Sequence, residues 1–253
     1  MRDYAVNTND FSFWYGSFQA LNGLTLNIPA GKITALIGPS GCGKSTFLKC
    51  LNRINERAGQ VSHNGSMQVF GHDIYHPSVA LPELRKQVGM VFQKPNPLPL
   101  SIFENVVFGV KTHMKKVTTA ELNAMVESAL TRVGLWEDLK DRLSKSALTL
   151  SLEKQQRLCI ARLLPLKPKL LLLDEPCSAL DPAGIEAIEG LIRDLKKDYS
   201  IIIVTHSMAQ AKRVSDDTIF MYMGELVEVG TTKQVFESPK EPRTAAYIEG
   251  RFG

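Results

Sequence analysis

The chain has 253 residues, 44% of them hydrophobic and 22% charged, as is typical of a globular protein that buries a full core. Its formal net charge is only +4 and its basic residues are spread along the sequence, so the basic stripe of a dedicated nucleic-acid-binding protein is missing. No stretch approaches the roughly 20 apolar residues needed to cross a bilayer, and Met1 to Asn9 lacks the apolar core of a signal peptide. We therefore expect a soluble chain of one large or two small domains, with no nucleic acid as partner.

Cysteine spacing argues against disulfides and zinc, because none of the four cysteines forms a C-x-x-C pair. Reduced thiols in a cytosolic compartment fit better. The residues are Cys42, Cys50, Cys159 and Cys177.

Short β-like runs separated by turns open the chain. They include Phe11 to Tyr15, Leu24 to Ile28 and Ile33 to Ile37, with Pro29 to Lys32 expected as a hairpin connection between the last two. The pattern predicts a β-rich layer at the start of the fold.

A glycine-rich segment follows the third run, and it matches the phosphate-binding P-loop G-x-x-x-x-G-K-[ST] at each required position. The loop lies between an apolar strand and a helix start at Ser45 to Leu51. Because these flanks are those of a P-loop, the alternative of a glycine-rich turn without a ligand is less favoured. Backbone N–H groups would surround the β-phosphate, while Lys44 would reach the β- and γ-phosphates and Ser45 would bind Mg²⁺. The predicted nucleotide-binding residues are Gly38, Pro39, Ser40, Gly41, Cys42, Gly43, Lys44, Ser45 and Thr46.

The middle of the chain changes from strands to helices. Strands are expected at Ser66 to Phe70 and Val88 to Phe92, and helical periodicity runs through Ile102 to Val110 and Thr119 to Val133. Residues 94–165 therefore resemble a helical insertion.

Alternation of strands and helices then resumes. A helix at Ile185 to Lys197, a strand at Ile201 to Thr205 and a helix at Met208 to Val214 are expected, while Met221 to Gly253 suggests strands and turns without identifiable chemistry.

Four leucines ending in two carboxylates, Leu170 to Glu175, form the Walker-B pattern of a buried parallel strand. Adjacent strand residues face opposite sides, so the two acids should have different roles. Asp174 would contact Mg²⁺ and Glu175 would polarise the attacking water. In an alternative interpretation, the two carboxylates have no catalytic role and only end the strand before Pro176. The P-loop upstream makes this interpretation less favoured.

Gln93 and His206 each follow a predicted strand, where ligands of open α/β sheets bind. Gln93 would ligate Mg²⁺ or orient water, and His206 would donate a hydrogen bond to the γ-phosphate. Either residue alone is more often an ordinary loop residue, so only their shared position favours function.

Taken in order, these motifs resemble the ATP-binding subunits of ABC transporters over essentially the whole chain. Longer strings resemble the ATPase of bacterial phosphate-specific import systems: GPSGCGKSTFLKCLNR, VGMVFQKPNPLPLSIFENV, QQRLCIARLL and YIEGRFG. The resemblance implies an α/β P-loop NTPase core of ABC-ATPase type, formed by residues 1–93 and 166–253, with an N-terminal antiparallel β layer and a helical subdomain at 94–165.

The same resemblance implies the remaining site residues and the partners. Tyr15 would stack on adenine, with Trp14 as the second candidate. In the alternative, the aromatic only packs in the first sheet. Ser178 to Asp181 would form a D-loop at the interface of a head-to-tail homodimer, and the Gln93 loop would face two transmembrane permease subunits. This chain would lie at the cytoplasmic face of the bacterial membrane and use ATP and Mg²⁺. The complex would import inorganic phosphate that a periplasmic or extracellular binding protein delivers.

This chain departs from the family at the L-S-G-G-Q signature, where it has LSLEK at Leu150 to Lys154. Glycines permit close approach to the partner's γ-phosphate, whereas Leu152 adds bulk and Glu153 adds negative charge toward a polyanion. Lys154 would offset part of that charge, and Ser151 would still donate at the helix N-terminus.

Two smaller departures follow. Pro165 is expected to stop or kink the signature helix, and Cys177 replaces a threonine without expected harm.

Three interpretations follow from the altered signature. The chain couples ATP hydrolysis to transport, or it binds ATP and switches conformation with little hydrolysis, or it is a soluble ABC ATPase acting on nucleic acid or translation. The first is favoured, because Lys44, Ser45, Gln93, Asp174, Glu175 and His206 are all present.

Overall fold

The computed structural model describes residues 3–114 and 116–252, so Met1 and Arg2 of the expected non-signal N-terminus lie outside the described residues. The strands are β1 (Tyr4–Tyr15), β2 (Phe18–Pro29), β3 (Ile33–Ile37), β4 (Val61–Val69), β5 (His72–Asp73), β6 (Val88–Val91), β7 (Leu170–Asp174), β8 (Ser200–Val204), β9 (Asp217–Tyr222) and β10 (Glu225–Thr231).

The α-helices are α1 (Lys44–Cys50), α2 (Leu81–Gln87), α3 (Ile102–His113), α4 (Thr119–Arg132), α5 (Trp136–Leu139), α6 (Leu152–Ala161), α7 (Pro182–Leu195), α8 (Met208–Val214), α9 (Thr232–Glu237) and α10 (Pro242–Ile248). Short 3-10 turns are η1 (Ile54–Ala58), η2 (Lys140–Arg142), η3 (Ala147–Thr149) and η4 (Leu164–Leu166). The predicted elements are present, with most boundaries shifted by a few residues and β1, β2 and β4 considerably longer than expected.

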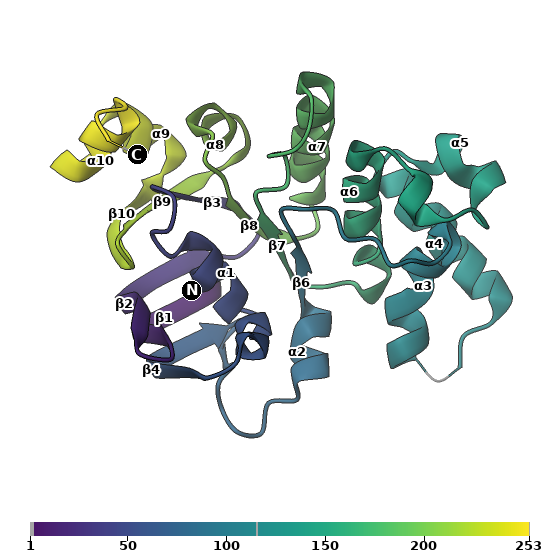
Figure 1. Ribbon diagram of the computed structural model, residues 1–253, viewed down its shortest axis with the longest axis horizontal. Helices are drawn as coiled ribbons and strands as arrows, with labels where there is room; N and C mark the ends of the chain where they lie inside the picture. Colours follow the sequence, from purple (N-terminus) through teal and green to yellow (C-terminus); the bar gives the residue numbers. More distant parts are fainter. Residues whose placement is uncertain (1–2, 115, 253) are drawn as a thin grey trace.

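A six-stranded sheet in the order β10-β9-β3-β8-β7-β6 forms the centre of the molecule (Figure 1). β9, β3, β8, β7 and β6 run parallel, and only β10 pairs antiparallel, with β9. The carboxyl ends of β3, β8, β7 and β6 therefore lie side by side at one edge of the sheet.

Both faces of this sheet are buried, which explains why its strands are almost continuously apolar. On β7, Leu170 and Leu172 belong to the core shared with α1, whereas Leu171 and Leu173 belong to the core shared with α7 and α8. The two-residue period of a strand thus divides one leucine run between two cores. This double burial fixes the strand register, because a slip by one residue would exchange the two faces.

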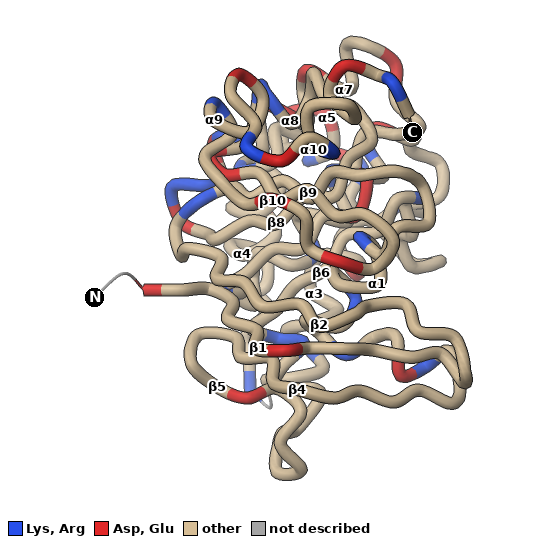
Figure 2. Tube along the Cα trace, turned by 90° about the vertical axis from the view of Figure 1, so that its left-hand side faces the viewer, with Lys and Arg blue, Asp and Glu red and all other residues tan. Residues whose placement is uncertain are grey.

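A second, antiparallel sheet in the order β2-β1-β4-β5 forms the expected β layer, which lies below the central sheet in Figure 2. Helix α1 lies between the sheets, since Phe47 and Leu48 share a core with residues of both. The hairpin expected at Pro29 to Lys32 is wrong: β2 and β3 belong to different sheets. Local turn residues signal a change of direction, but they do not specify which strand becomes the partner.

Helices α3 to α6 occupy the segment between β6 and β7 and lie to one side of the central sheet (Figure 1). Helix α6 ends at Ala161, and Pro165 lies in the following η4 turn, as the missing N–H of proline predicts.

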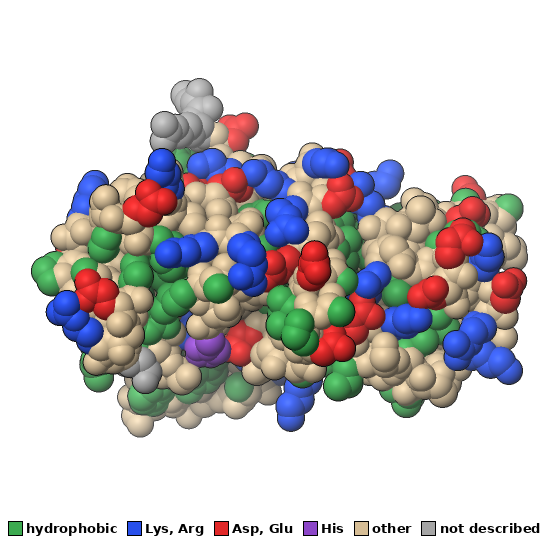
Figure 3. All heavy atoms as spheres, turned by 90° about the horizontal axis from the view of Figure 1, so that it is seen from above, with side chains coloured by type: hydrophobic (Ala, Val, Ile, Leu, Met, Phe, Trp, Pro, Cys, Tyr) green, Lys and Arg blue, Asp and Glu red, His purple; other side chains and the backbone are tan. Residues whose placement is uncertain are grey.

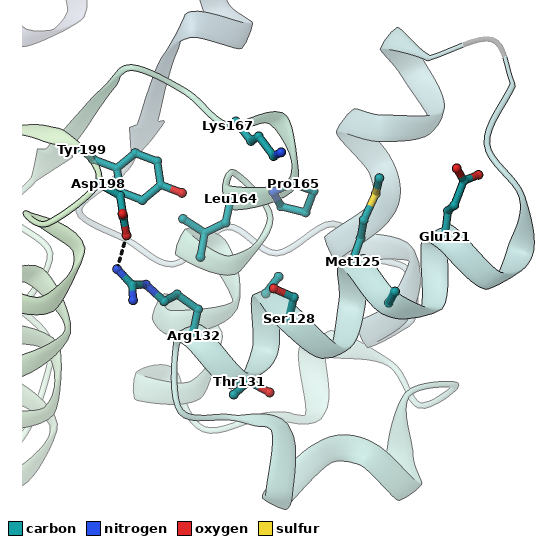
Figure 4. Close-up of a pocket in the computed structure, with 12 residues that line it drawn as sticks. Glu121, Met125, Ser128, Thr131, Arg132, Leu164, Pro165, Lys167, Asp198 and Tyr199 are labelled. Carbon is teal, nitrogen blue, oxygen red and sulfur yellow. Dashed lines mark hydrogen bonds and ion pairs between the residues drawn. The ribbon is translucent and has the colours of Figure 1, made fainter.

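Arg132 of α4 connects this helical segment to the core through Asp194, at 3.2 Å, and through Asp198 (Figure 4). A cavity of about 780 Å³ opens beside this contact, lined among others by Met125, Leu164 and Tyr199. It lies near the amino end of β8, away from the edge where the predicted site residues gather.

Among the described residues, no helix combines the length and apolar character that a membrane span needs. On the face seen in Figure 3, basic and acidic side chains are interspersed.

Candidate nucleotide-binding site

Four polar segments converge at the carboxyl edge of the central sheet. Along β3, β8, β7 and β6 they are, in order, the P-loop after Ile37, His206, the acidic pair after Leu173, and Gln93. The sequence places them up to 168 residues apart, so only the strand order makes them neighbours. The expected convergence of strand ends is confirmed.

The P-loop turns tightly between β3 and α1, and two glycines explain how. Gly43 has φ of 102°, and a Cβ there would lie 2.9 Å from the carbonyl oxygen of Ala20. Gly38 has φ of 146°, and its Cβ would lie 2.2 Å from the carbonyl oxygen of Met221. Both positions therefore require glycine for conformation and for space.

Lys44 is 4% exposed, and its Nζ donates to the carbonyl oxygens of Gly38 and Pro39, each at 2.7 Å. These bonds satisfy a buried ammonium group and hold its charge within the loop. The loop therefore has a cation at its centre and the first N–H groups of α1 at its rim, both suited to an anion.

The metal candidates Ser45 and Asp174 lie together, since Ser45 Oγ donates to Asp174 Oδ1 at 2.7 Å. Lys49 Nζ lies 3.8 Å from the other carboxylate oxygen. Hydroxyl and carboxylate oxygens are ligands that Mg²⁺ prefers, and Mg²⁺ usually takes few protein ligands beside water and phosphate oxygens. The donor set fits Mg²⁺, although the described residues contain no cluster of three or more His, Cys, Asp or Glu side chains that could hold a metal by themselves.

Glu175 lies just beyond β7 in a left-handed conformation with φ of 47°. The side chains of Asp174 and Glu175 therefore separate through this turn and not through strand alternation, which corrects the sequence argument. Both carboxylate oxygens of Glu175 are occupied: Gln93 Nε2 donates to Oε2 at 3.0 Å, and His206 Nε2 lies 2.5 Å from Oε1.

Tyr15 lies on the α1 side of β1. Its ring packs edge-on against buried Phe13, with centroids 5.1 Å apart, and burial raises the pKa of its hydroxyl, which faces Thr46 and Asn55. Strand alternation places Trp14 on the other side. Of the two aromatics, Tyr15 therefore lies on the same side of the sheet as α1.

Sequence reasoning overlooked Phe18, which pairs with Tyr15 across the β1–β2 turn and is 67% exposed. An exposed aromatic beside the adenine candidate supplies a second π-face. The sequence could have identified Phe18 as a candidate, because aromatic residues flank the short Gly16-Ser17 turn on both sides.

The C-terminal segment, which had no predicted chemistry, supports the P-loop. The ring of Tyr247 on α10 stacks on Phe220, with centroids 4.9 Å apart, and its hydroxyl lies near the backbone of Gly38. Helix α10 therefore contacts the P-loop through Tyr247.

The signature segment begins helix α6, with Ser151 as its N-cap accepting from the Lys154 N–H at 3.4 Å. Glu153 pairs with Arg157 one turn later, and Lys154 Nζ lies 2.7 Å from Asp138. Both charged side chains therefore have a partner of opposite charge within the helical segment. Leu152 is 53% exposed and remains the bulky group on this surface.

The fold and this site define a P-loop nucleotide-binding protein with a helical subdomain inserted before its acidic strand. The family model for the ABC transporter matches residues 21–178. The chain belongs to the ABC transporter family, and its predicted fold class is confirmed.

Full-length relatives agree with this assignment. The chain is 51% identical over 254 aligned residues to the phosphate import ATP-binding protein PstB 5 of Trichormus variabilis, covering 98% of this chain and 97% of the relative. It is 50% identical to the phosphate import ATP-binding protein PstB of Bacteroides thetaiotaomicron, with 98% of each chain covered.

Solved structures show the same fold. The cbiO1 protein of Clostridium perfringens, part of the ABC transporter complex cbiONQ, superposes with a TM-score of 0.82 at 30% identity, covering 98% of this chain and 97% of that one. A bacterial Atm1-family ABC exporter with ATP bound superposes with a TM-score of 0.80 at 26% identity, covering 99% of this chain and 42% of the exporter.

Proposed function

We propose that this chain is the ATP-hydrolysing subunit of a membrane importer for inorganic phosphate. The observation that carries the proposal is the junction at Glu175, where two polar side chains from neighbouring strand ends meet one carboxylate beside a P-loop. The relatives at about 50% identity are phosphate import ATP-binding proteins, which supplies the cargo.

In this proposal the P-loop binds the phosphates of ATP. Lys44 exchanges its bonds with loop carbonyls for the β- and γ-phosphates, and Tyr15 and Phe18 face the adenine. Glu175 accepts a proton from the attacking water once Gln93 and His206 have left its oxygens. His206 then donates to the γ-phosphate as negative charge develops there.

Ser45 and Asp174 would hold Mg²⁺, with Gln93 as a further oxygen ligand. When bound, the ion neutralises charge on the β- and γ-phosphates. The chain's own contribution is to keep the two oxygens 2.7 Å apart before nucleotide arrives.

The signature of this chain would act through its helix N-terminus. Arg157 pairs with Glu153 and offsets its negative charge in the first turn of α6, where backbone N–H groups are suited to an anion. We infer that Ser151 and this terminus contact the nucleotide of a second copy, in a homodimer that closes on ATP and reopens after hydrolysis.

Closure would be transmitted through the loop after Gln93 to two transmembrane permease subunits at the cytoplasmic face of the membrane. Gln156, which is fully buried on α6, donates to the carbonyl oxygen of Phe92 at 3.1 Å, and Arg162 donates to Asn96 at 3.1 Å. The signature helix and the Gln93 loop are thereby joined, so they would move together.

The test is ATP-driven uptake of radiolabelled phosphate by proteoliposomes that contain this chain and its permease subunits, with sulfate as the control cargo. Phosphate uptake that requires both ATP and this chain supports the proposal. ATP turnover accompanied by sulfate uptake, or by uptake of neither anion, would contradict the cargo assignment.

A further inference from the structure

One buried carboxylate near the proposed catalytic pair, Glu175 and His206, has no role in the mechanism above. Glu189 lies on α7 and is 3% exposed. Arg213 of α8 pairs with both of its oxygens, Nε at 2.8 Å and Nη2 at 2.7 Å. Burying a carboxylate is unfavourable unless it is paired and hydrogen-bonded, so this contact fixes α8 against α7 at one point.

Gln210 extends the contact toward both catalytic segments. Its Nε2 lies 3.5 Å from Glu189 Oε1, and its amide also lies beside the thiol of Cys177. Cys177 is two residues after Glu175, and Gln210 is four residues after His206. The contacts of Glu189 therefore extend to one residue shortly after Glu175 and to one residue shortly after His206.

The position of His206 depends on this arrangement, because its own side chain is 42% exposed and little packing holds it. Helix α8 begins two residues later, with Ser207 as N-cap accepting from the Gln210 N–H at 3.2 Å. Only seven residues long, this helix has little intrinsic stability and takes its orientation from tertiary contacts. A cavity of about 280 Å³ is lined by Glu175 and His206 and also by Gln210 and Arg213, so the two groups border the same space.

We propose that Glu189, acting through Arg213 and Gln210, is a positioning residue that sets His206 against Glu175 for ATP hydrolysis. The inference rests on the proposed function, because it needs His206 and Glu175 to act on ATP. Glu189 does not touch the reacting atoms, so its effect must appear in turnover and not in ATP binding.

The test compares Glu189→Gln with Glu186→Gln, a matched change at an exposed position on the same helix. We expect Glu189→Gln to lower kcat about 10-fold with KM for ATP changed by less than about twofold, and Glu186→Gln to leave both unchanged. A KM effect without a kcat effect, or unchanged kcat, would overturn the inference.

A double-mutant cycle separates positioning from general destabilisation. In a His206→Ala background, Glu189→Gln should not lower the rate of single-turnover hydrolysis further, because the side chain that Glu189 positions is already absent. If the two losses multiply, Glu189 acts on the fold at large and the inference fails. If His206→Ala alone retains full turnover, the proposed mechanism fails first, which keeps the two failures distinguishable.

Thermal unfolding of each variant checks the fold. Should Glu189→Gln not fold, Arg213→Lys replaces it, since that side chain is half exposed and lysine keeps the charge while losing the paired geometry. The same pattern of lowered kcat, unchanged KM and no further loss with His206→Ala is expected. Unchanged kcat in Arg213→Lys would count against the inference.

Discussion

Glu175 leaves β7 with φ of 47°, and its two oxygens face Gln93 and His206. A non-glycine residue in this region is strained by a few kcal/mol at most, and such strain is found where function requires it. In the proposed mechanism Glu175 accepts a proton from the attacking water, so Gln93 and His206 would exchange their contacts with this carboxylate for contacts with nucleotide and water.

Glu175→Gln should abolish turnover while leaving ATP binding intact, because an amide cannot accept the proton but has the same shape. Turnover is expected to fall by a factor on the order of 10² to 10⁴. Steady-state phosphate release measures the first effect and equilibrium binding of a fluorescent ATP analogue the second. Unchanged turnover would remove Glu175 from the role of base.

Lys44→Ala should weaken nucleotide binding itself, since charge-assisted hydrogen bonds to phosphate are lost. A loss of about 10- to 100-fold in ATP affinity is expected from the strength of such bonds. Lys111→Ala is the matched control, because Lys111 is exposed on α3 and pairs with Glu104. Equal affinity in Lys44→Ala would contradict the P-loop assignment.

At the scale of elements, helix α6 shows how a changed motif keeps its local structure. Ser151 caps the helix, and Glu153 and Arg157 form an i,i+4 pair that supports the first turn. Leu152, Glu153 and Lys154 are also better helix formers than glycine. The altered segment is therefore a more rigid helix start than the family pattern.

Restoring Gly, Gly and Gln at positions 152–154 should lower stability by about 1 to 2 kcal/mol, because two glycines and the loss of an ion pair both weaken the first turn. ATP turnover should be comparable with that of the parent chain, if the present signature is a working one. Urea unfolding and steady-state ATPase assays give the two values. Turnover that appears only after restoration would show that the parent binds ATP but does not complete the site.

At the scale of the whole molecule, the two faces of the central sheet bury separate cores, and α1 anchors the P-loop in one of them. All four cysteines lie buried as free thiols, and burial raises the pKa of Cys50 from 9.0 to about 12. The folded state therefore holds this proton at a pH where the unfolded chain releases it. The contribution of Cys50 to the free energy of unfolding is fully present below pH 9 and is lost as the pH rises toward about 12.

The free energy of unfolding should consequently fall faster above pH 9 in the parent than in Cys50→Ala, by about 1.4 kcal/mol per pH unit. Urea unfolding at pH 8, 9 and 10 measures the two slopes, and a constant offset from the lost side chain does not affect them. Parallel curves would show that Cys50 is not the group that titrates.

The sequence by itself determined the phosphate-binding loop, the acidic strand end and the alternating strands and helices. Each of these depends on residues adjacent in the chain: glycine where the backbone requires it, apolar runs where both sheet faces are buried, and proline where a helix must end. Gln93 and His206 could be named only as strand-end residues, since nothing local distinguishes them from ordinary loop residues.

Only the tertiary structure decided what depends on distant partners. Strand order brought Gln93 and His206 onto the same carboxylate and placed β2 and β3 in different sheets. Packing of α5 against α6 brought Asp138 to Lys154. The burial of Glu189 also depends on a distant partner. The sequence shows only a glutamate on an amphipathic helix, and the Arg213 contact from α8 is seen only in the folded chain. Local patterns encode how the backbone can run, whereas side-chain pairing across the fold is set by packing that no local pattern contains.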